Sequence, residues 1–392
     1  MPKYSFQGLR DNLEGKRQTI VLTITKACNL RCSYCYESKS RGAESIDFET
    51  ARDIIKYYME ADNGFEAIEF DFFGGEPLLK FSLIKEIIEW FKSVRTWRKR
   101  FIFLIETNGT LLTDEIKNWL NKNKYFVIVT FSIDGNQTAH NLTRDNSYDL
   151  LLPNIPFFQE NWPFQPAKMT ICEKNLPFLA ESVIELEKMG LFFTANIVFE
   201  DIWGVGEKKK EMLKEYEKQL DQLVEFYSER LDLYPVGPIL SHVIEAYDKH
   251  PIRDENGCLR FCGAGHEMIM VDVDGTIYPC HRFAPWVTGR PAPRAIVNNQ
   301  IEWRPEECKL CKLISICPTC AGFNWQINGD TGIRTRFHCD AFKVEFIASA
   351  KLEANRIANM DDLNLRNLSA EELQKKKSRI EVIYKLINEG LI

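Results

Sequence analysis

The sequence predicts an α/β protein in which a partial (β/α)6 barrel is followed by a small cysteine-rich domain and a C-terminal helical extension. Over the first 230 residues, six short runs of β-branched and apolar residues alternate with segments that have helical spacing. Eight of the 12 cysteines lie after residue 257. The chain is 45% hydrophobic and 27% charged, which is typical of a globular protein with a sizeable core.

The alternation of strands and helices determines the expected topology. Residues 18–25 read as a buried strand, and similar runs follow near residues 67, 102, 126, 164 and 192. Helical spacing occurs at residues 47–61, 81–94, 113–121 and 176–189. Strands that alternate with helices pair in parallel through right-handed crossovers. Six units predict an open, partial barrel, with the functional groups at the carboxyl ends of the strands.

The composition of the sequence also indicates the remaining elements and the domain boundaries. Residues 207–230 predict a long charged helix, and Asp274-Gly275 predicts a hairpin turn. Two more helices are expected at residues 340–358 and 370–389. The expected division is an N-terminal segment 1–17, a barrel 18–230, a linker 231–257, a cysteine-rich domain 258–350 and a helical extension 351–392.

Charge and hydropathy exclude several classes of function. The net charge of −6 argues against general nucleic-acid binding. No apolar run approaches the roughly 20 residues of a membrane helix, and the N-terminus lacks the apolar core of a signal peptide. We therefore expect a cytoplasmic protein without nucleic-acid or membrane partners. In such a chain, clustered cysteines indicate metal ligands rather than disulfides.

The first cysteine motif follows the first predicted strand directly. Cys28, Cys32 and Cys35 form a CxxxCxxC pattern on one short loop. Three thiolates can ligate three irons of a 4Fe–4S cluster and leave the fourth iron open, whereas an electron carrier would use four. A zinc site is the alternative, but the loop offers no fourth ligand.

The run CNLRCSYCY resembles the signature of the radical S-adenosylmethionine (SAM) superfamily, with Tyr34 as the aromatic residue before the last cysteine. The resemblance implies that the open iron chelates SAM. Electron transfer from the cluster then releases methionine and a 5′-deoxyadenosyl radical, which abstracts hydrogen from an unactivated C–H bond.

Motifs at three further strand ends extend the resemblance. A GGE segment follows the second strand, TNG ends the third, and SIDG with a later arginine follows the fourth. In the family, the GGE segment holds the methionine end of SAM, the Asn and Ser contact the ribose, and the arginine meets the carboxylate. The residues that the resemblance assigns to SAM are Tyr34, Gly74, Gly75, Glu76, Asn108, Ser132, Asp134 and Arg144.

The second cysteine region resembles the SPASM domain, the auxiliary-cluster module of peptide- and protein-modifying radical SAM enzymes. Cys317 and Cys320 are separated by two residues, where the family pattern has three between the corresponding cysteines. Eight thiolates suit two further 4Fe–4S clusters, so we expect three clusters in all. The resemblance assigns Cys258, Cys262, Cys280 and Cys320 to one auxiliary cluster and Cys308, Cys311, Cys317 and Cys339 to the other. These clusters would carry electrons or act as structural staples.

Several functions remain open within this resemblance. We favour a maturase that installs a thioether, carbon–carbon or carbon–oxygen crosslink in a ribosomally made peptide. A sulfatase maturase that makes formylglycine would be expected to carry an Asp after Cys280, where this chain has His281. A small-molecule dehydrogenase is a further alternative, and an iron–sulfur electron carrier is the non-enzymatic one.

Two residues are candidates for catalysis beyond the clusters. His281 could accept a proton or hydrogen-bond to a cluster sulfur. Cys172 ends the fifth predicted strand, where a thiol could donate a hydrogen atom in peptide epimerisation, although buried core cysteines are common. The expected partners are the peptide substrate and a flavodoxin- or ferredoxin-type reductant. Because only 17 residues precede the first strand, we expect a peptide leader to bind a separate partner protein or to dock directly on the barrel.

Overall fold

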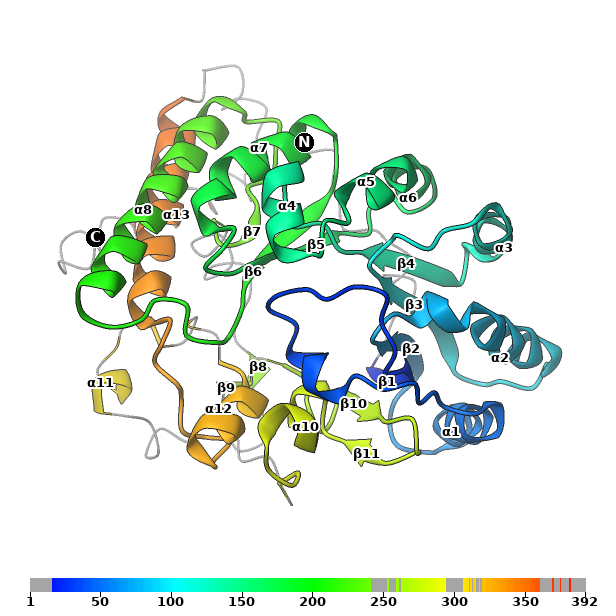
Figure 1. Ribbon diagram of the computed structural model, residues 1–392. Coiled ribbons are helices and arrows are strands. Elements are labelled where there is room, and N and C mark those ends of the chain that lie inside the picture. The colour runs from blue at the N-terminus through cyan, green and yellow to red at the C-terminus, as the bar shows by residue number, and fades with distance from the viewer. Residues whose placement is uncertain are drawn as a thin grey trace.

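The protein is described here from a computed structural model (Figure 1). It describes residues 16–240, 262–293 and 319–359, together with residues 252–253, 259–260, 306–309, 311, 313–314, 317, 369, 374 and 381. Cys258 lies outside the described residues, as do most of the segment 1–17 and most of the predicted helix at 370–389.

The first four strands form one parallel sheet in sequence order, as predicted. These strands are β1 (Arg17–Thr25), β2 (Ala67–Gly74), β3 (Arg100–Thr107) and β4 (Val127–Phe131). The helices α1 (Phe48–Glu60), α2 (Phe81–Ser93) and α3 (Asp114–Asn123) connect them and lie along the outer face of the sheet (Figure 1). Parallel neighbours joined by outer helices place all four carboxyl ends at one edge.

A second parallel sheet continues the curve of the first. It contains β5 (Ala167–Ile171), β6 (Phe193–Ile197) and the short β7 (Gly237–Pro238). A parallel bridge between Ser132 and Lys168 joins the end of β4 to β5. The helices α7 (Leu179–Lys188) and α8 (Gly206–Glu229) follow β5 and β6. The six predicted strands are confirmed, and they form the open barrel expected from the sequence.

The cysteine-rich region adds two strands to the barrel sheet. The strand β10 (Met268–Val271) pairs in parallel with β1, and β11 (Ile277–Tyr278) returns antiparallel to it. Gly275 has a φ of 82° in the turn between them, which glycine adopts without strain. The predicted hairpin is therefore confirmed, and the sheet runs without interruption from the barrel into the cysteine-rich region.

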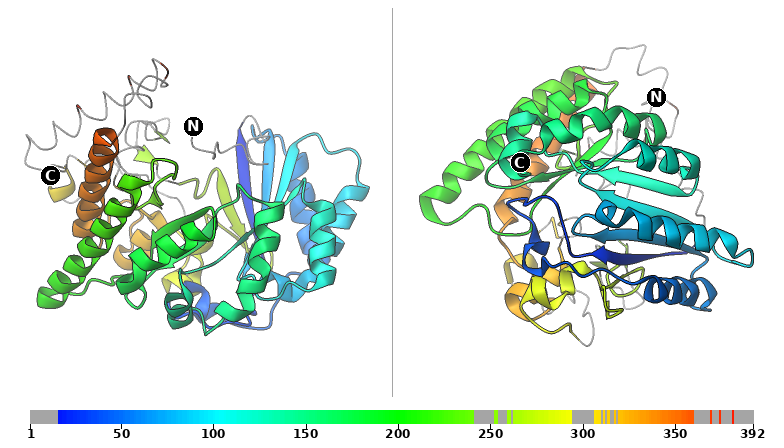
Figure 2. Two further views of the ribbon diagram at one scale, coloured as in Figure 1. Left: turned by 90° about the horizontal axis from the view of Figure 1, so that it is seen from above. Right: turned by 45° about the vertical axis from the view of Figure 1, so that its right-hand side comes forward.

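The long helix α13 (Cys339–Ala358) lies beside α8 (Figures 1 and 2). The Tyr216 hydroxyl donates to Glu345 at 2.9 Å, and Lys351 pairs with Asp221 at 3.0 Å. The other elements are η2 (Tyr36–Ser40), η3 (Pro77–Lys80), α4 (Gln137–Thr143), α5 (Tyr148–Leu151), η4 (Leu152–Asn154), α6 (Ile155–Asn161), η5 (Leu176–Phe178), β8 (Ile252–Arg253), β9 (Leu259–Arg260), η6 (His281–Phe283), α10 (Pro285–Thr288), α11 (Glu306–Lys309) and α12 (Ala321–Asn328).

The two faces of the barrel sheet have different side chains. Phe70 and Phe72 of β2 join the main hydrophobic core with residues of the outer helices. Because strand side chains alternate, Asp71 and Phe73 face the inside of the barrel. Polar and aromatic groups therefore gather inside the barrel, close to the strand ends.

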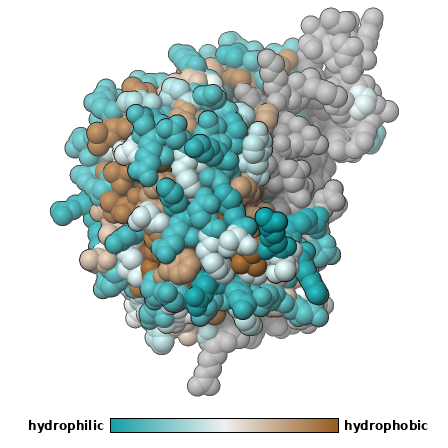
Figure 3. Space-filling view, turned by 90° about the vertical axis from the view of Figure 1, so that its right-hand side faces the viewer, coloured by the Kyte–Doolittle hydropathy of each residue, from teal (hydrophilic) through white to brown (hydrophobic). Residues whose placement is uncertain are grey.

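The outer surface on the side of α2 and α3 is mostly hydrophilic, with patches of hydrophobic side chains between (Figure 3). In the described part of the chain, no helix has the length and apolar character needed to cross a membrane.

Candidate active site

The cysteines of the CxxxCxxC motif lie on the loop that follows β1. The backbone N–H of Ser33 donates to the carbonyl of Thr143 at 2.8 Å, which ties this loop to the end of α4. All three thiols are partly covered: Cys28, Cys32 and Cys35. The loop therefore lies at the carboxyl edge of the barrel, where sequence reasoning predicted the chemistry.

The three thiols interact with one another. Burial raises the pKa of Cys32 to about 11; the Arg144 guanidinium opposes this rise, while the nearby thiols of Cys35 and Cys28 reinforce it. Grouped thiols of this kind become thiolates when a metal compensates their charge. Their number and their proximity fit a 4Fe–4S cluster held by three cysteines.

The two glycines after β2 allow a close approach between backbone segments. A Cβ on Gly74 would lie 2.3 Å from the carbonyl oxygen of Thr25, and one on Gly75 would lie 2.2 Å from that of Ala27. We expected these glycines to approach a ligand. The structure shows that they also bring the end of β2 against the start of the cysteine loop, and Glu76 N–H donates to Ala27 at 2.8 Å.

Glu76 is 1% exposed, and its carboxylate accepts three hydrogen bonds from its own chain. The donors are the Leu78 N–H at 3.0 Å, the Thr107 hydroxyl at 2.8 Å and the Asn108 N–H at 2.7 Å. Burial raises the pKa of Glu76 to about 6, and these hydrogen bonds limit the rise. The carboxylate thus joins the ends of β2 and β3, and its predicted contact with the methionine end of SAM remains a prediction.

Asp134 is the centre of a buried polar network below the cysteine loop. It is 0% exposed and pairs with Arg144 at 3.0 Å. It also accepts from the Tyr34 hydroxyl at 2.6 Å, the Thr143 hydroxyl at 2.8 Å and the Thr170 N–H at 3.0 Å. Asp134 therefore orients Tyr34 and Arg144, and its contact with SAM remains a prediction.

Arg144 connects this network to the cysteine loop. One terminal nitrogen of its guanidinium lies 3.9 Å from the sulfur of Cys32, and the guanidinium lies 5.5 Å from the centre of the Tyr34 ring. Burial alone would lower the pKa of Arg144, but the carboxylate of Asp134 raises it above the usual value. A permanent positive charge is therefore fixed beside the first cysteine cluster.

The two predicted ribose contacts also lie at strand ends. The Asn108 amide donates to Asn29 on the cysteine loop at 2.9 Å, and its oxygen accepts from Thr110. Ser132 is half-buried where β4 meets β5. Both lie at the same edge as the cysteine loop, and their contacts with SAM remain predictions.

A cavity of about 430 Å³ opens beside the cysteine loop. Tyr34 and Cys35 form one wall, Cys172 and Glu200 from the ends of β5 and β6 form another, and Val287 of the cysteine-rich region closes it. Cys172 is 6% exposed, and burial raises the pKa of its thiol. The structure thus brings Cys172 to the cavity that the first cluster motif lines.

His281 lies between two aromatic rings. Its ring stacks on Tyr36 at a centroid distance of 5.5 Å and on Phe73 at 5.1 Å. Burial lowers the pKa of His281 to about 4. Tyr36 follows the cysteine loop and Phe73 precedes the two glycines, so His281 connects the cysteine-rich region to both motifs.

Sequence reasoning missed two ion pairs near the site. Arg282 donates to Glu200 at 2.8 Å, and its guanidinium lies 4.3 Å from the centre of the Tyr36 ring. Lys168 of β5 pairs with Glu106 of β3 inside the barrel. Arg282 is adjacent to His281, and Glu106 precedes the TNG motif, but neither ion pair has a local sequence pattern because its partners are far apart in the chain.

The described cysteines of the second region fall into two groups. The thiols of Cys320 and Cys262 contribute to the raised pKa of Cys280, after the larger effect of burial. Burial raises the pKa of Cys317 to about 11, and the thiols of Cys339, Cys311 and Cys308 add to this rise. The structure therefore separates Cys262, Cys280 and Cys320 from Cys308, Cys311, Cys317 and Cys339. Within the described ranges, no set of three or more His, Cys, Asp or Glu side chains is arranged around a single metal ion.

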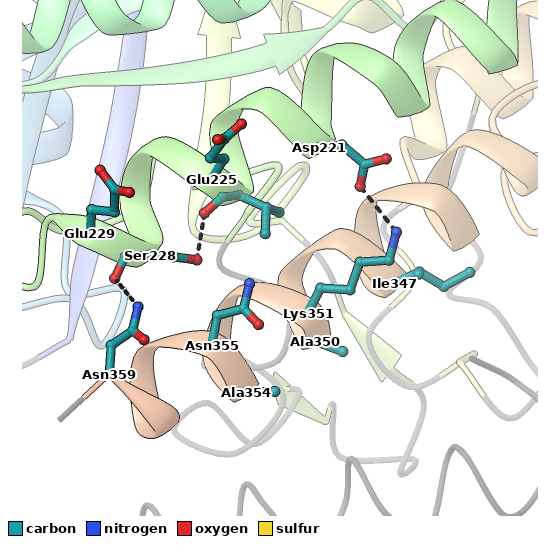
Figure 4. Close-up of a pocket in the computed structure, with 11 residues that line it drawn as sticks. Asp221, Glu225, Ser228, Glu229, Ile347, Ala350, Lys351, Ala354, Asn355 and Asn359 are labelled. Carbon is teal, nitrogen blue, oxygen red and sulfur yellow. Dashed lines mark hydrogen bonds and ion pairs between the residues drawn. The ribbon is translucent and has the colours of Figure 1, made fainter.

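A larger hollow of about 670 Å³ lies between α8 and α13, away from the strand ends (Figure 4). Its lining combines apolar residues such as Ile347 and Ala350 with the Asp221–Lys351 ion pair. It contains no cysteine or histidine, so the smaller cavity is the candidate active site.

Comparisons with known proteins agree with this geometry. Residues 22–163 match the model of the radical SAM superfamily. An uncharacterized protein of Methanocaldococcus jannaschii is 31% identical over 215 residues, which are 52% of this chain and 70% of the relative. A cysteine-type anaerobic sulfatase-maturating enzyme of Clostridium perfringens is 22% identical, and the match covers 87% of this chain and 98% of that enzyme.

Two solved structures share the fold. The structure of anSMEcpe with bound AdoMet and the Cp18Cys peptide has a TM-score of 0.65 at 18% identity, and the match covers 87% of this chain and 99% of the other. Streptococcus suis SuiB bound to the precursor peptide SuiA has a TM-score of 0.55 at 15% identity, with 84% and 77% covered. Members of this family use a 4Fe–4S cluster and SAM. The cysteine loop, the polar network beneath it and these matches lead to one conclusion: the chain belongs to the radical SAM superfamily.

Proposed function

We propose that this protein is a radical SAM maturase that abstracts hydrogen from a ribosomally made peptide and leaves an oxidative crosslink, either a thioether or a carbon–carbon or carbon–oxygen bond. The observation that carries the proposal is the cavity of about 430 Å³. Its walls come from the cysteine loop, the ends of β5 and β6, and the cysteine-rich region, so a peptide in it would contact all three.

Three 4Fe–4S clusters fit the cysteines. Cys28, Cys32 and Cys35 would hold the first, and the two separate groups of the second region would hold the others. Cys258, which lies outside the described residues, is the proposed fourth ligand beside Cys262, Cys280 and Cys320. When bound, the first cluster and SAM supply the radical that removes hydrogen. This composition agrees with the number of thiols and with their grouping, and it is tested by iron and sulfide analysis.

The chain's own residues position and enclose the reactants. Asp134 fixes the Tyr34 hydroxyl and the Arg144 guanidinium, so that both are held rigidly beside the cysteine loop. Glu76 fixes the turn that contains Asn108. Preorganised groups of this kind bind a ligand with little loss of side-chain conformational entropy.

His281 has a positioning role in this proposal. The stacking of its ring between Tyr36 and Phe73 supports this role over the catalytic role that the sequence suggested. If it is correct, a His281→Phe variant, which keeps a flat ring, should retain the modification, and His281→Ala should lose it.

Two other outcomes have specific support. The match over 98% of a sulfatase-maturating enzyme favours formylglycine synthesis, whereas the presence of His281 after Cys280 disfavours it. The location of Cys172 in the cavity wall favours epimerisation, in which its thiol would donate hydrogen. A flavodoxin- or ferredoxin-type reductant and a separate leader-binding protein remain the proposed partners.

The test is the high-resolution mass of short peptides encoded beside the gene, after anaerobic incubation with reconstituted enzyme, SAM and dithionite. Loss of two hydrogens with blocked thiol alkylation indicates a thioether. The same loss with free thiols and no aldehyde indicates a carbon–carbon or carbon–oxygen bond.

The other outcomes of this test assign different chemistry. A new aldehyde indicates formylglycine, and an unchanged mass that gains one deuterium from heavy water indicates epimerisation. The control is Cys32→Ser, which should abolish both 5′-deoxyadenosine formation and peptide modification. If wild-type enzyme forms 5′-deoxyadenosine and modifies none of the peptides, the proposed substrate class is wrong.

A further inference from the structure

We propose that the cavity binds an acidic segment of the peptide and that Lys39 and Lys174 select for it. This inference rests on the proposed function, because it names the substrate class of the same cavity. It comes from the charges of the described residues that line the cavity.

The acidic side chains of the cavity wall already have cationic partners. Glu200 accepts from Arg282 at 2.8 Å and at 3.4 Å, in a pair whose arginine side chain is only 9% exposed. Glu173 pairs with Lys208 at 2.8 Å. Neither carboxylate therefore offers an uncompensated negative charge to a ligand.

The two lysines of the wall have no such compensation. Lys39 lies in η2, just after the cysteine loop, and Lys174 lies just after β5. Both are exposed, and among the described residues neither has an ion-pair or hydrogen-bond partner for its ammonium group. The positive charge of Lys174 acts on the thiol of Cys172 and lowers its pKa, which opposes the larger effect of burial.

The position of these two lysines favours an acidic peptide over a basic one. The formal charge of the whole chain is −6, so its average field repels an acidic peptide. The cavity wall is a local exception, with two uncompensated positive charges on different elements beside one cavity. A peptide that places carboxylates near Cys172 would gain both ion pairs, whereas a basic peptide would meet two like charges.

The magnitude follows from the exposure of the lysines. Exposed ion pairs contribute about 0.2–1 kcal/mol each, so two pairs of about 0.7 kcal/mol give roughly a tenfold preference in affinity for an acidic over a neutral peptide. Salt screens such pairs, with a Debye length of about 10 Å at 0.1 M and about 3 Å at 1 M. The preference should therefore fall several-fold between these two conditions.

The experiment uses three synthetic peptides of equal length that differ only around a central cysteine, which is flanked by glutamates, glutamines or lysines. Their affinity for anaerobically reconstituted, full-length enzyme with SAM is measured by fluorescence anisotropy. We expect the order glutamate, glutamine, lysine, with about a tenfold step between the first two. The double variant Lys39→Glu, Lys174→Glu should reverse the order.

The matched control is Lys122→Glu, Lys188→Glu, which changes the net charge equally at exposed lysines of α3 and α7 that do not line the cavity. Loss of the acidic preference in this control as well would assign the effect to net charge and overturn the proposal. Equal affinity of wild-type enzyme for all three peptides would also overturn it.

Two further readouts separate this inference from the proposed function. If the cavity double variant raises the KM for SAM and keeps the peptide order, the lysines serve the cofactor, and the inference fails. If wild-type enzyme forms 5′-deoxyadenosine but shows no charge preference, the charge selection alone fails. If it forms none with any peptide or reductant, the proposed function itself fails.

Discussion

Replacement of Asp134 by alanine should destabilise the barrel strongly, because it leaves a buried cation without its partner. Asp134 is 0% exposed and Arg144 is 7% exposed, and their charged atoms lie 3.0 Å apart. Removal of one partner from a buried ion pair costs about 3–5 kcal/mol. The hydroxyl of Tyr34 also loses its acceptor, which adds about 1 kcal/mol. We expect the free energy of unfolding to fall by about 4 kcal/mol or more.

A double-mutant cycle isolates the ion pair. Arg144→Met removes the cation, so Asp134→Ala should cost much less in that background, and the coupling energy should be about 2–3 kcal/mol. The assay is urea unfolding followed by tryptophan fluorescence on anaerobically purified protein. Asp134→Asn is the control, because it keeps the shape of the side chain and removes only its charge. Effects that add within about 0.5 kcal/mol would refute the account of a coupled buried pair.

Three more predictions follow from the site. Gly74→Ala should lower the free energy of unfolding by about 1–3 kcal/mol and weaken SAM binding, because the φ of Gly74 is 125° and the new Cβ would meet the carbonyl of Thr25. The control is Gly64→Ala, where φ is 75° and the space around the new Cβ is open. It should destabilise the protein less, and titration calorimetry should show unchanged SAM binding. Burial lowers the pKa of His140 to about 4, so the free energy of unfolding should be highest above about pH 6.5 and should fall by roughly 3 kcal/mol as the pH decreases to 4. The variant His140→Gln should lack most of this pH dependence in urea unfolding, and equal pH slopes for both proteins would contradict the prediction. Arg282→Ala should lower the midpoint of thermal unfolding more than Glu200→Gln, since it removes the packing of the guanidinium on the rings of Tyr36 and Phe199 as well as the ion pair. Equal shifts by circular dichroism would count against that packing.

Local pattern was sufficient to predict most of the barrel. β1 and β2 begin within one residue of their expected starts, because short apolar runs bounded by turn residues have few alternative structures. The hairpin around Gly275 was predicted for a similar reason, since few residues adopt its backbone conformation. The parallel pairing of β10 with β1 was not predictable, because Thr19 and its partner Met268 lie far apart in the chain and no local pattern in either segment specifies the other.

Some features of the candidate site were likewise predictable from local sequence, and others depend on tertiary packing. The spacing of Cys28, Cys32 and Cys35 identified the cluster loop from the sequence, since ligands on one short loop are constrained by the chain itself. The hydrogen bonds that Asp134 and Glu76 accept from their own chain were not expected from the sequence, and the contacts of both residues with SAM remain predictions. Sequence position places a carboxylate at a strand end, but only the packing around it determines whether it faces a ligand or its own chain.

The sequence by itself determined the alternation of strands and helices in the barrel, the CxxxCxxC loop and the family to which the chain belongs, because each depends on residues close together in the chain. The tertiary structure alone decided which charges neutralise one another around the cavity. Glu200 is paired with Arg282 and Glu173 with Lys208, while Lys39 and Lys174 have no partner among the described residues. Such pairing depends on distances of a few ångströms between distant segments, which no local pattern encodes.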